Sequence, residues 1–408
     1  MYREVVESQT LLINTQSKLM ESQNRDVIKF GFGQSPFLPP KSVIEAFRAS
    51  AHEKAYTSVQ GDAVLRERIS KFHKEHNGLS VQPENILIAP GSKTLLYSIL
   101  LAFKKADVLI PQPAWVSYAP QAKLTGHHII KLPTTFESRW RVTAEIIHRA
   151  VSQKRHDTAI MIFNYPGNPD GLTYSGEELQ SIAEAVGEHN ILVISDEIYG
   201  LLDHRDRHQS FANYYPQKTI TTTGLSKWCG AGGWRLGVAL LYDDIPAPFK
   251  KVLIGIGSET YSCAPTPVQM AAGEAYRNYE SIKPYLARQR SILSSLGQYC
   301  YRQLNRANIR LHPPQGGFYL FPDFSLHQEK LRSAGITHSA ELCQRILQDT
   351  GVALLPASAF GFDDHLLAVR LAYVDFEEPG EEVSFDIATH APKVETGIRR
   401  ICEWVEDL

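Results

Sequence analysis

The sequence predicts an α/β protein in which a larger lobe holds a mainly parallel, doubly wound sheet and a smaller α+β lobe lies beside it. Three observations lead to this fold class. Short apolar runs alternate with helical patterns between about residues 85 and 242, helices predominate after about residue 285, and 408 residues exceed the usual size of one core. We expect residues 1–45 to form an arm and part of the smaller lobe, residues 46–285 the larger lobe, and residues 286–408 the rest of the smaller lobe.

Seven apolar runs predict the strands of the larger lobe. They span residues 86–90, 107–111, 127–132, 158–164, 191–197, 219–223 and 236–242. Most are rich in Val, Ile and Leu with little polar alternation, as expected for strands that are covered on both faces. Amphipathic stretches between them, such as residues 92–105 and 175–189, predict helices on both sides of the sheet, and therefore a three-layer arrangement.

The smaller lobe is predicted from its own strands and helices. Strand-like runs cover residues 316–321, 351–356 and 366–374, and residues 393–408 form a final amphipathic helix. We expect the amino-terminal segment to complete this lobe.

Composition and charge exclude several classes of protein. The chain is 43% hydrophobic and 21% charged, and its net charge of −2 gives no overall attraction to nucleic acid or to an anionic membrane. The five cysteines are scattered and form no C-x-x-C pair, so we expect reduced thiols and no metal site. The first ten residues lack the apolar core of a signal peptide, and no apolar run could span a bilayer. These features predict a cytoplasmic protein.

Polar residues follow several of the predicted strands, where ligands bind in doubly wound sheets. Asn168 lies in a loop fixed by two prolines and two glycines, and Asp196 and Tyr199 close the next strand. A buried acid at that position needs a cationic partner, such as a protonated ring nitrogen. Taken singly, these residues also fit an ordinary turn and a helix cap.

Two cations follow the strand at residues 219–223. Lys227 lies among small residues, where burial would lower its pKa and make the amine a nucleophile towards an aldehyde. Arg235 could hold a phosphate through its planar guanidinium group. A lone lysine is nevertheless more often a solvated surface charge.

Three further positions could bind parts of a ligand. The turn before residue 92 starts a helix whose first amides, near Ser92 and Lys93, can bind an anion. Trp115 could stack on a flat ring, although most tryptophans fill cores. Arg370 lies within an apolar strand and needs an anion, either a substrate carboxylate or a structural acid. If the partner is the substrate, we expect Arg370 to be solvated in an open cleft before substrate binds.

Together these residues resemble the class I/II aminotransferases of fold type I, and most closely the prokaryotic aspartate aminotransferase branch. The resemblance covers nearly the whole chain, in order and spacing. Its motifs are VIKFGFGQSPF, YTSVQGDAVLRERI, IAPGSK, PQPAWVSY, NYPGNPDG, SDEIYG, SKWCGAGGWRLG, GGFYLF, LLPASAFG and the late Arg370.

The resemblance implies a pyridoxal 5′-phosphate cofactor and a role for each residue. Lys227 would hold the cofactor covalently and move a proton, Asp196 would keep the ring nitrogen protonated, and Arg370 would bind the substrate carboxylate with the backbone near Gly33. The remaining cofactor contacts would come from Asn168 and Tyr199 at the ring oxygen, Trp115 on the ring face, Ser92, Lys93, Ser226 and Arg235 at the phosphate, and Tyr56 from the second subunit of a homodimer with shared active sites. Trp115 and Asn168 would also contact the substrate.

Three positions depart from the family pattern. Asp170 stands where the family usually has Thr, Ala357 replaces a common glycine, and Gly224 occupies a place where Ser or Asn often contacts the phosphate. Thr223 or Ser226 could take over that contact.

The function that follows is transfer of the amino group of an L-amino acid, aspartate or a related one, to a 2-oxo acid such as 2-oxoglutarate. The same cofactor site would also allow a C–S lyase, a decarboxylase or a cyclising lyase, or an aminotransferase of aromatic, alanine or prephenate type. A ligand-sensing regulator would need an added DNA-binding domain, for which the residues before Val27 show no pattern.

Overall fold

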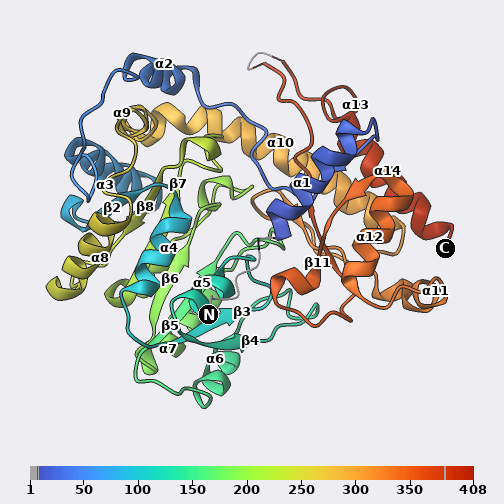
Figure 1. The fold of residues 1–408 in the computed structure, drawn as a ribbon, viewed down its shortest axis with the longest axis horizontal. Coiled ribbons are helices and arrows are strands. Elements are labelled where there is room, and N and C mark those ends of the chain that lie inside the picture. The colour runs from blue at the N-terminus through green and yellow to red at the C-terminus, as the bar shows by residue number, and fades with distance from the viewer. Residues whose placement is uncertain (1–6, 8, 381–382) are drawn as a thin grey trace.

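The computed structural model describes residues 7, 9–380 and 383–408, and it contains the predicted three-layer fold (Figure 1). The amino-terminal residues for which we expect no signal peptide lie mostly outside this part of the chain. A seven-stranded sheet forms the middle layer. In spatial order its strands are β2 (Ile86–Ala89), β8 (Gly237–Leu240), β7 (Thr219–Gly224), β6 (Leu192–Asp196), β5 (Ala159–Asn164), β3 (Asp107–Pro111) and β4 (His128–Leu132).

The sheet is mainly parallel, as predicted. Strand β8 runs antiparallel to both of its neighbours, and the other adjacent strands are parallel. The register sets Asn164 opposite Asp196 and Asp196 opposite Thr222. The carboxyl ends of three adjacent strands therefore present a row of polar residues.

Helices cover both faces of the sheet because each presents an apolar stripe to it. One face packs on α6 (Ala144–Val151) and α7 (Gly176–Glu188), whose buried residues include Ile147 and Leu179. The other face packs on α4 (Ser92–Leu101), α5 (Tyr118–Leu124) and α8 (Ala247–Thr260). Helix α7 begins with a capping box formed by Ser175 and Glu178, which satisfies amides that its first turn leaves free.

The remaining helices of the larger lobe extend this core. They are α2 (Lys41–Ala49), α3 (Ala63–Asn77) and α9 (Thr266–Ala275). Helix α3 buries Leu65, Ile69 and Phe72 on one stripe. The side chain of Asp62 caps its amino end, and Gly78, with a φ of 71°, caps its carboxyl end.

The smaller lobe contains short strands and the carboxyl-terminal helices. Its elements are α1 (Gln9–Ser22), β1 (Ile28–Lys29), β9 (Tyr319–Leu320), α11 (Gln328–Ser333), α12 (Ser339–Thr350), β10 (Val352–Ala353), β11 (Leu355–Pro356), β12 (Val369–Ala372), α13 (Ile387–His390) and α14 (Pro392–Glu406). The run at residues 351–356 forms two strands, because β10 pairs with β1 whereas β11 pairs with β12.

The amino-terminal segment joins this smaller lobe. Strand β1 pairs in parallel with β10, and Met20 of α1 packs with Leu347 of α12. Figure 1 shows α1, in blue, beside the orange and red helices of the carboxyl terminus. The long helix α10 (Tyr279–Arg306) passes through the predicted boundary at residue 285, so the division into residues 1–45, 46–285 and 286–408 stays a proposal.

Seven short 3-10 helices complete the elements of the described residues: Pro83–Asn85, Gly200–Leu202, Phe211–Asn213, Pro216–Lys218, Gly232–Trp234, Ser325–His327 and Ala357–Phe360. Within the described residues, none of the helices is long and apolar enough to cross a membrane.

Candidate functional site

A cavity of about 420 Å³ opens at the carboxyl ends of the parallel strands. Segments from both lobes line it, because the amino-terminal segment and β12 meet the strand ends there. The lining residues are Leu11, Phe32, Gly33, Gln34, Ser92, Lys93, Trp115, Tyr118, Asn164, Asn168, Asp196, Ile198, Tyr199, Ser226, Lys227, Gly232, Gly233, Arg235, Tyr319 and Arg370. Every predicted site residue is among them except Tyr56, whose side chain is 87% exposed elsewhere on the surface.

Asp196 ends β6 as a buried carboxylate on the cavity wall. The hydroxyl of Tyr118 donates to its Oδ2 at 2.6 Å, and the hydroxyl of Thr222 donates to Oδ1 at 3.1 Å. Burial raises the pKa of Asp196 to about 6, despite these two donors. The described residues give it no ion pair, so the cationic partner that burial calls for must come from a ligand. A protonated ring nitrogen fits this carboxylate.

Lys227 lies beyond the end of β7 and points its amine into the same cavity. Its Nζ donates to the backbone oxygen of Gly33 at 2.6 Å and lies 5.6 Å from the ring centre of Tyr199. Burial lowers the pKa of Lys227 to about 7, and the nearby cations Arg370 and Arg235 lower it further. A substantial share of this amine is therefore uncharged at neutral pH, as a nucleophile requires.

A cationic cradle lies at the amino-terminal end of α4. Gly91 has a φ of 90°, and a Cβ there would come within 2.1 Å of the guanidinium of Arg235. Gly237 lets its own strand approach the start of α4 equally closely, since a Cβ added there would lie 2.2 Å from the amide nitrogen of Ser92. Burial lowers the pKa of Lys93, and Arg235 lowers it further. Helix amides, a lysine and an arginine at one point suit a phosphate group.

Arg370 is held in β12 with a side chain that is only 1% exposed. Its Nη1 donates to Oδ1 of Asn168 at 3.1 Å, and its Nη2 donates to the backbone oxygen of Gly31 at 2.5 Å. The rings of Tyr319 and Phe360 lie 4.8 and 5.3 Å from the guanidinium carbon. The expectation that Arg370 is solvated in an open cleft is therefore wrong. Neutral oxygens and aromatic faces replace water around the cation.

Two aromatic residues close the cavity near Gly33. The hydroxyls of Tyr199 and Tyr319 lie 2.9 Å apart and share a hydrogen bond. A Cβ on Gly33 would come within 2.0 Å of the hydroxyl oxygen of Tyr319, so this position needs glycine. Trp115 lines the same cavity, with the Lys93 amine 4.9 Å from its ring centre.

The structure gives physical reasons for two of the departures from the family pattern. Asp170 is buried and pairs with Arg141 at 2.5 Å, so the carboxylate has a charged partner of its own. A Cβ on Gly224 would lie 2.5 Å from the backbone oxygen of Leu236, which leaves no room for Ser or Asn. Of the two substitutes considered, Ser226 lines the cavity, whereas Thr223 lies within β7.

Four residues that contribute to the site were not predicted. Tyr118 and Thr222 bond Asp196, Asn164 donates from Nδ2 to the backbone oxygen of Asp196 at 2.7 Å, and Tyr319 bonds Tyr199. Tyr118 begins α5 three residues after Trp115, in the same PQPAWVSY motif, and this closeness to a predicted site residue could have indicated it. Thr222 and Asn164 lie beside Asp196 because of the register of the strands, which the sequence does not specify.

Comparisons with known proteins agree with this geometry. The family described as aminotransferase class I and II matches residues 25–378. An aspartate aminotransferase of a Bacillus species is 32% identical over 90% of this chain and 92% of its own length. An asparagine–oxo-acid transaminase of Streptococcus mutans is 31% identical over 91% of this chain and 93% of its own.

Solved structures show the same fold. The aspartate aminotransferase of Thermus thermophilus, solved with maleate, superposes with a TM-score of 0.85 at 25% identity, covering 98% of this chain and all of that one. The fold and the matches define a fold type I aminotransferase, an enzyme that transfers amino groups between amino acids and oxo acids. This chain belongs to the class I and II aminotransferase family, whose members generally depend on pyridoxal phosphate.

Proposed function

We propose that this enzyme binds pyridoxal 5′-phosphate through Lys227 and transfers the amino group of aspartate, or a related L-amino acid, to a 2-oxo acid such as 2-oxoglutarate. One observation carries the proposal. A buried lysine with a pKa of about 7 shares a cavity with a buried carboxylate that has no cationic partner among the described residues, beside a cationic cradle. The names of the relatives support aspartate or asparagine as donor.

When bound, the cofactor supplies a ring that withdraws electrons and so stabilises the charge left on the substrate Cα after proton loss. Asp196 would keep the proton on the ring nitrogen, and Tyr118 and Thr222 would orient that carboxylate. Lys227 would hold the cofactor and, once released, carry the proton at Cα. These two roles use the raised pKa of the Asp196 carboxyl and the lowered pKa of the Lys227 amine.

The other lining residues would bind and orient. Asn168 uses Oδ1 to accept from Arg370, which leaves its Nδ2 free to donate towards the ring oxygen, together with the Tyr199 hydroxyl. Trp115 would cover the ring. Ser92, Lys93, Ser226 and Arg235 would hold the phosphate, and Arg370, with the backbone near Gly33, the α-carboxylate of the substrate.

Assembly and location extend the proposal. We propose a homodimer in which Tyr56, exposed in the single chain, reaches the site of the second subunit. A reducing compartment such as the cytoplasm is supported by the five cysteines, which are all unpaired.

The test is production of glutamate from aspartate and 2-oxoglutarate by the purified enzyme. Lys227→Ala should lower this rate at least about a thousandfold, which corresponds to about 4 kcal/mol, because the other lysine that lines the cavity, Lys93, lies at the proposed phosphate cradle. Lys218→Ala changes a partly buried lysine just before β7, whose amine bonds Asn190 and does not line the cavity, and should leave the rate unchanged. A Lys227→Ala enzyme with the wild-type rate would disprove the assignment. A rate survey over twenty amino acids would define the donor.

A further inference from the structure

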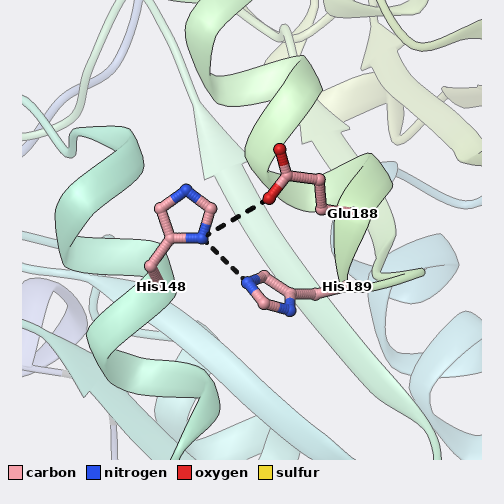
Figure 2. A group of neighbouring side chains, drawn as sticks. All are labelled: His148, Glu188 and His189. Atoms are coloured by element: carbon pink, nitrogen blue, oxygen red, sulfur yellow. Dashed lines mark hydrogen bonds and ion pairs between the residues drawn. The ribbon is translucent and has the colours of Figure 1, made fainter.

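A group of two histidines and a glutamate lies where α6 and α7 end, apart from the catalytic cavity (Figure 2). Nδ1 of His148 lies 2.8 Å from Nε2 of His189 and 3.9 Å from Oε2 of Glu188. The three ligand atoms are all within 4.8 Å of one another. Figure 2 shows the two rings and the carboxylate turned towards a common point between the helices.

The place of this group in the fold separates it from the chemistry. Glu188 and His189 lie at the end of α7, just before β6 begins at Leu192, and His148 is in the last turn of α6, before β5. Helices that connect parallel strands end where the next strand begins, whereas the catalytic cavity lies where β5 and β6 end. The group is therefore at the opposite end of the sheet from Asp196 and Lys227.

Local electrostatics favour a cation at this point. The carboxyl ends of two helices meet there, and each carries a partial negative charge from its free carbonyl groups. Glu188 adds a full negative charge. Glu145, which lies one turn before His148 on α6, adds a second negative charge nearby. Arg149 is the positive charge in the same turn.

We propose that His148, Glu188 and His189 form a binding site for a divalent transition-metal ion of the zinc type. Two imidazole nitrogens and one carboxylate oxygen are a ligand set that zinc accepts, with water in the fourth tetrahedral position. Zinc–nitrogen distances of about 2.0–2.1 Å place the two nitrogens roughly 3.3 Å apart, so they must separate by about half an ångström. The Glu188 oxygen, now 3.9 Å from Nδ1 of His148, must move closer by a similar distance. The hydrogen-bonding proton between the rings moves to the outer nitrogen of one of them.

The ion would join α6 to α7 across one face of the sheet. Both helices already pack on each other, and the metal adds a link between their exposed ends. This role would be structural. The proposal departs from our expectation, drawn from the cysteine pattern, that the chain has no metal site.

The test is a zinc titration of the holoenzyme by calorimetry at pH 7.5, after treatment with a chelator. We expect one zinc ion per chain, and a Kd that rises at least about tenfold in His148→Ala and in His189→Ala. Glu188→Gln should weaken binding less, because the amide oxygen still coordinates. Zinc should slow hydrogen exchange in residues 144–151 and 176–188 of the wild type.

His365→Ala is the matched control. His365 also packs against a second histidine, His338, with ring centres 4.5 Å apart beside a glutamate, but the described residues bring only the first group close enough to chelate. Zinc binding should be unchanged in this variant. Zinc binding that persists in both His148→Ala and His189→Ala would place the ion elsewhere and overturn the proposal, as would no binding at about 100 μM zinc.

Discussion

Asp196 and Lys227 line one cavity, and burial shifts their pKa values in opposite directions. The carboxyl pKa rises to about 6 and the amine pKa falls to about 7, because desolvation disfavours the charged form of either group. The donors Tyr118 and Thr222 limit the shift of Asp196, whereas Arg370 and Arg235 enlarge that of Lys227. A ligand that brings a cation to Asp196 would restore its charge.

The first residue-scale prediction concerns Asp196. Asp196→Ala should still bind the cofactor but lower kcat by several orders of magnitude, because an unprotonated ring withdraws electrons poorly. Steady-state kinetics with aspartate and 2-oxoglutarate would measure this. A loss of less than about tenfold, roughly 1.4 kcal/mol, would show that Asp196 does not have this role.

The second residue-scale prediction concerns Arg370. Arg370→Lys should lower kcat/KM about 30-fold to several thousandfold, the effect of about 2–5 kcal/mol, because a lysine cannot make the two parallel hydrogen bonds of a guanidinium. Melting temperature should also fall, since the buried arginine holds the carbonyl of Gly31 and so joins the amino-terminal segment to β12.

Arg345→Lys provides the control for Arg370. Arg345 is half-exposed and bonds Asp349 one helical turn away, so neither stability nor kcat/KM should change much. If Arg370→Lys unfolds easily but keeps near-normal kcat/KM, Arg370 has a purely structural role.

At the scale of single elements, α3 carries the buried His73 and the partly buried His76. Both ring nitrogens of His73 lack a hydrogen-bond partner among the described residues. Burial lowers the pKa of His73 to about 4. Nearby Glu197 opposes this shift, and His208 adds to it. Burial likewise lowers the pKa of His76 to about 3, and His73, His208 and Arg290 lower it further. His73 and His76 should therefore stay uncharged in the folded protein until the pH is well below its neutral value.

The prediction for α3 is a loss of stability in acid. Above pH 6.5 both folded and unfolded chains keep His73 neutral, and its stabilising effect is complete. As the pH falls from about 6.5 to about 4, the unfolded chain binds the proton and the folded chain does not, so roughly 3 kcal/mol of unfolding free energy is lost.

Urea denaturation at pH 7.5 and pH 4.5 would measure this loss. His73→Leu should lose less stability between the two values than the wild type, whereas His52→Leu, which changes an exposed histidine, should lose as much as the wild type. An unchanged pH dependence in His73→Leu would contradict the prediction.

At the scale of the whole molecule, the site forms only where the two lobes meet. The amine of Lys227 bonds the backbone of Gly33, and the guanidinium of Arg370 bonds Asn168, so each lobe supplies one partner. Exposed Tyr56 has no place in this assembly within a single chain.

The whole-molecule prediction is a homodimer with shared sites. Sedimentation at micromolar concentration should give twice the chain mass of 45.8 kDa. Tyr56→Phe should keep the dimer but weaken cofactor binding roughly tenfold or more, because a hydrogen bond to a charged group is lost. Tyr301→Phe, on α10, should change neither property. A fully active monomer would refute the shared site.

The sequence alone determined the strands, the helices that cover them and the family, because apolar periodicity and turn residues are local signals. The sequence also indicated four residues that line the cavity: Lys227, Asp196, Asn168 and Arg235. Each of them comes just after a predicted strand or in a glycine-rich turn. Their order along the chain was sufficient to place them at one edge of a parallel sheet.

Only the tertiary structure decided which groups surround these residues. Tyr118 as the partner of Asp196, Arg141 as the partner of Asp170, and the contact between His148 and His189 each join segments separated by tens of residues. The burial of Arg370 behind Tyr319 and Phe360 likewise depends on how three separate segments of the smaller lobe pack. Such contacts arise from register and packing, which no local pattern of residues specifies.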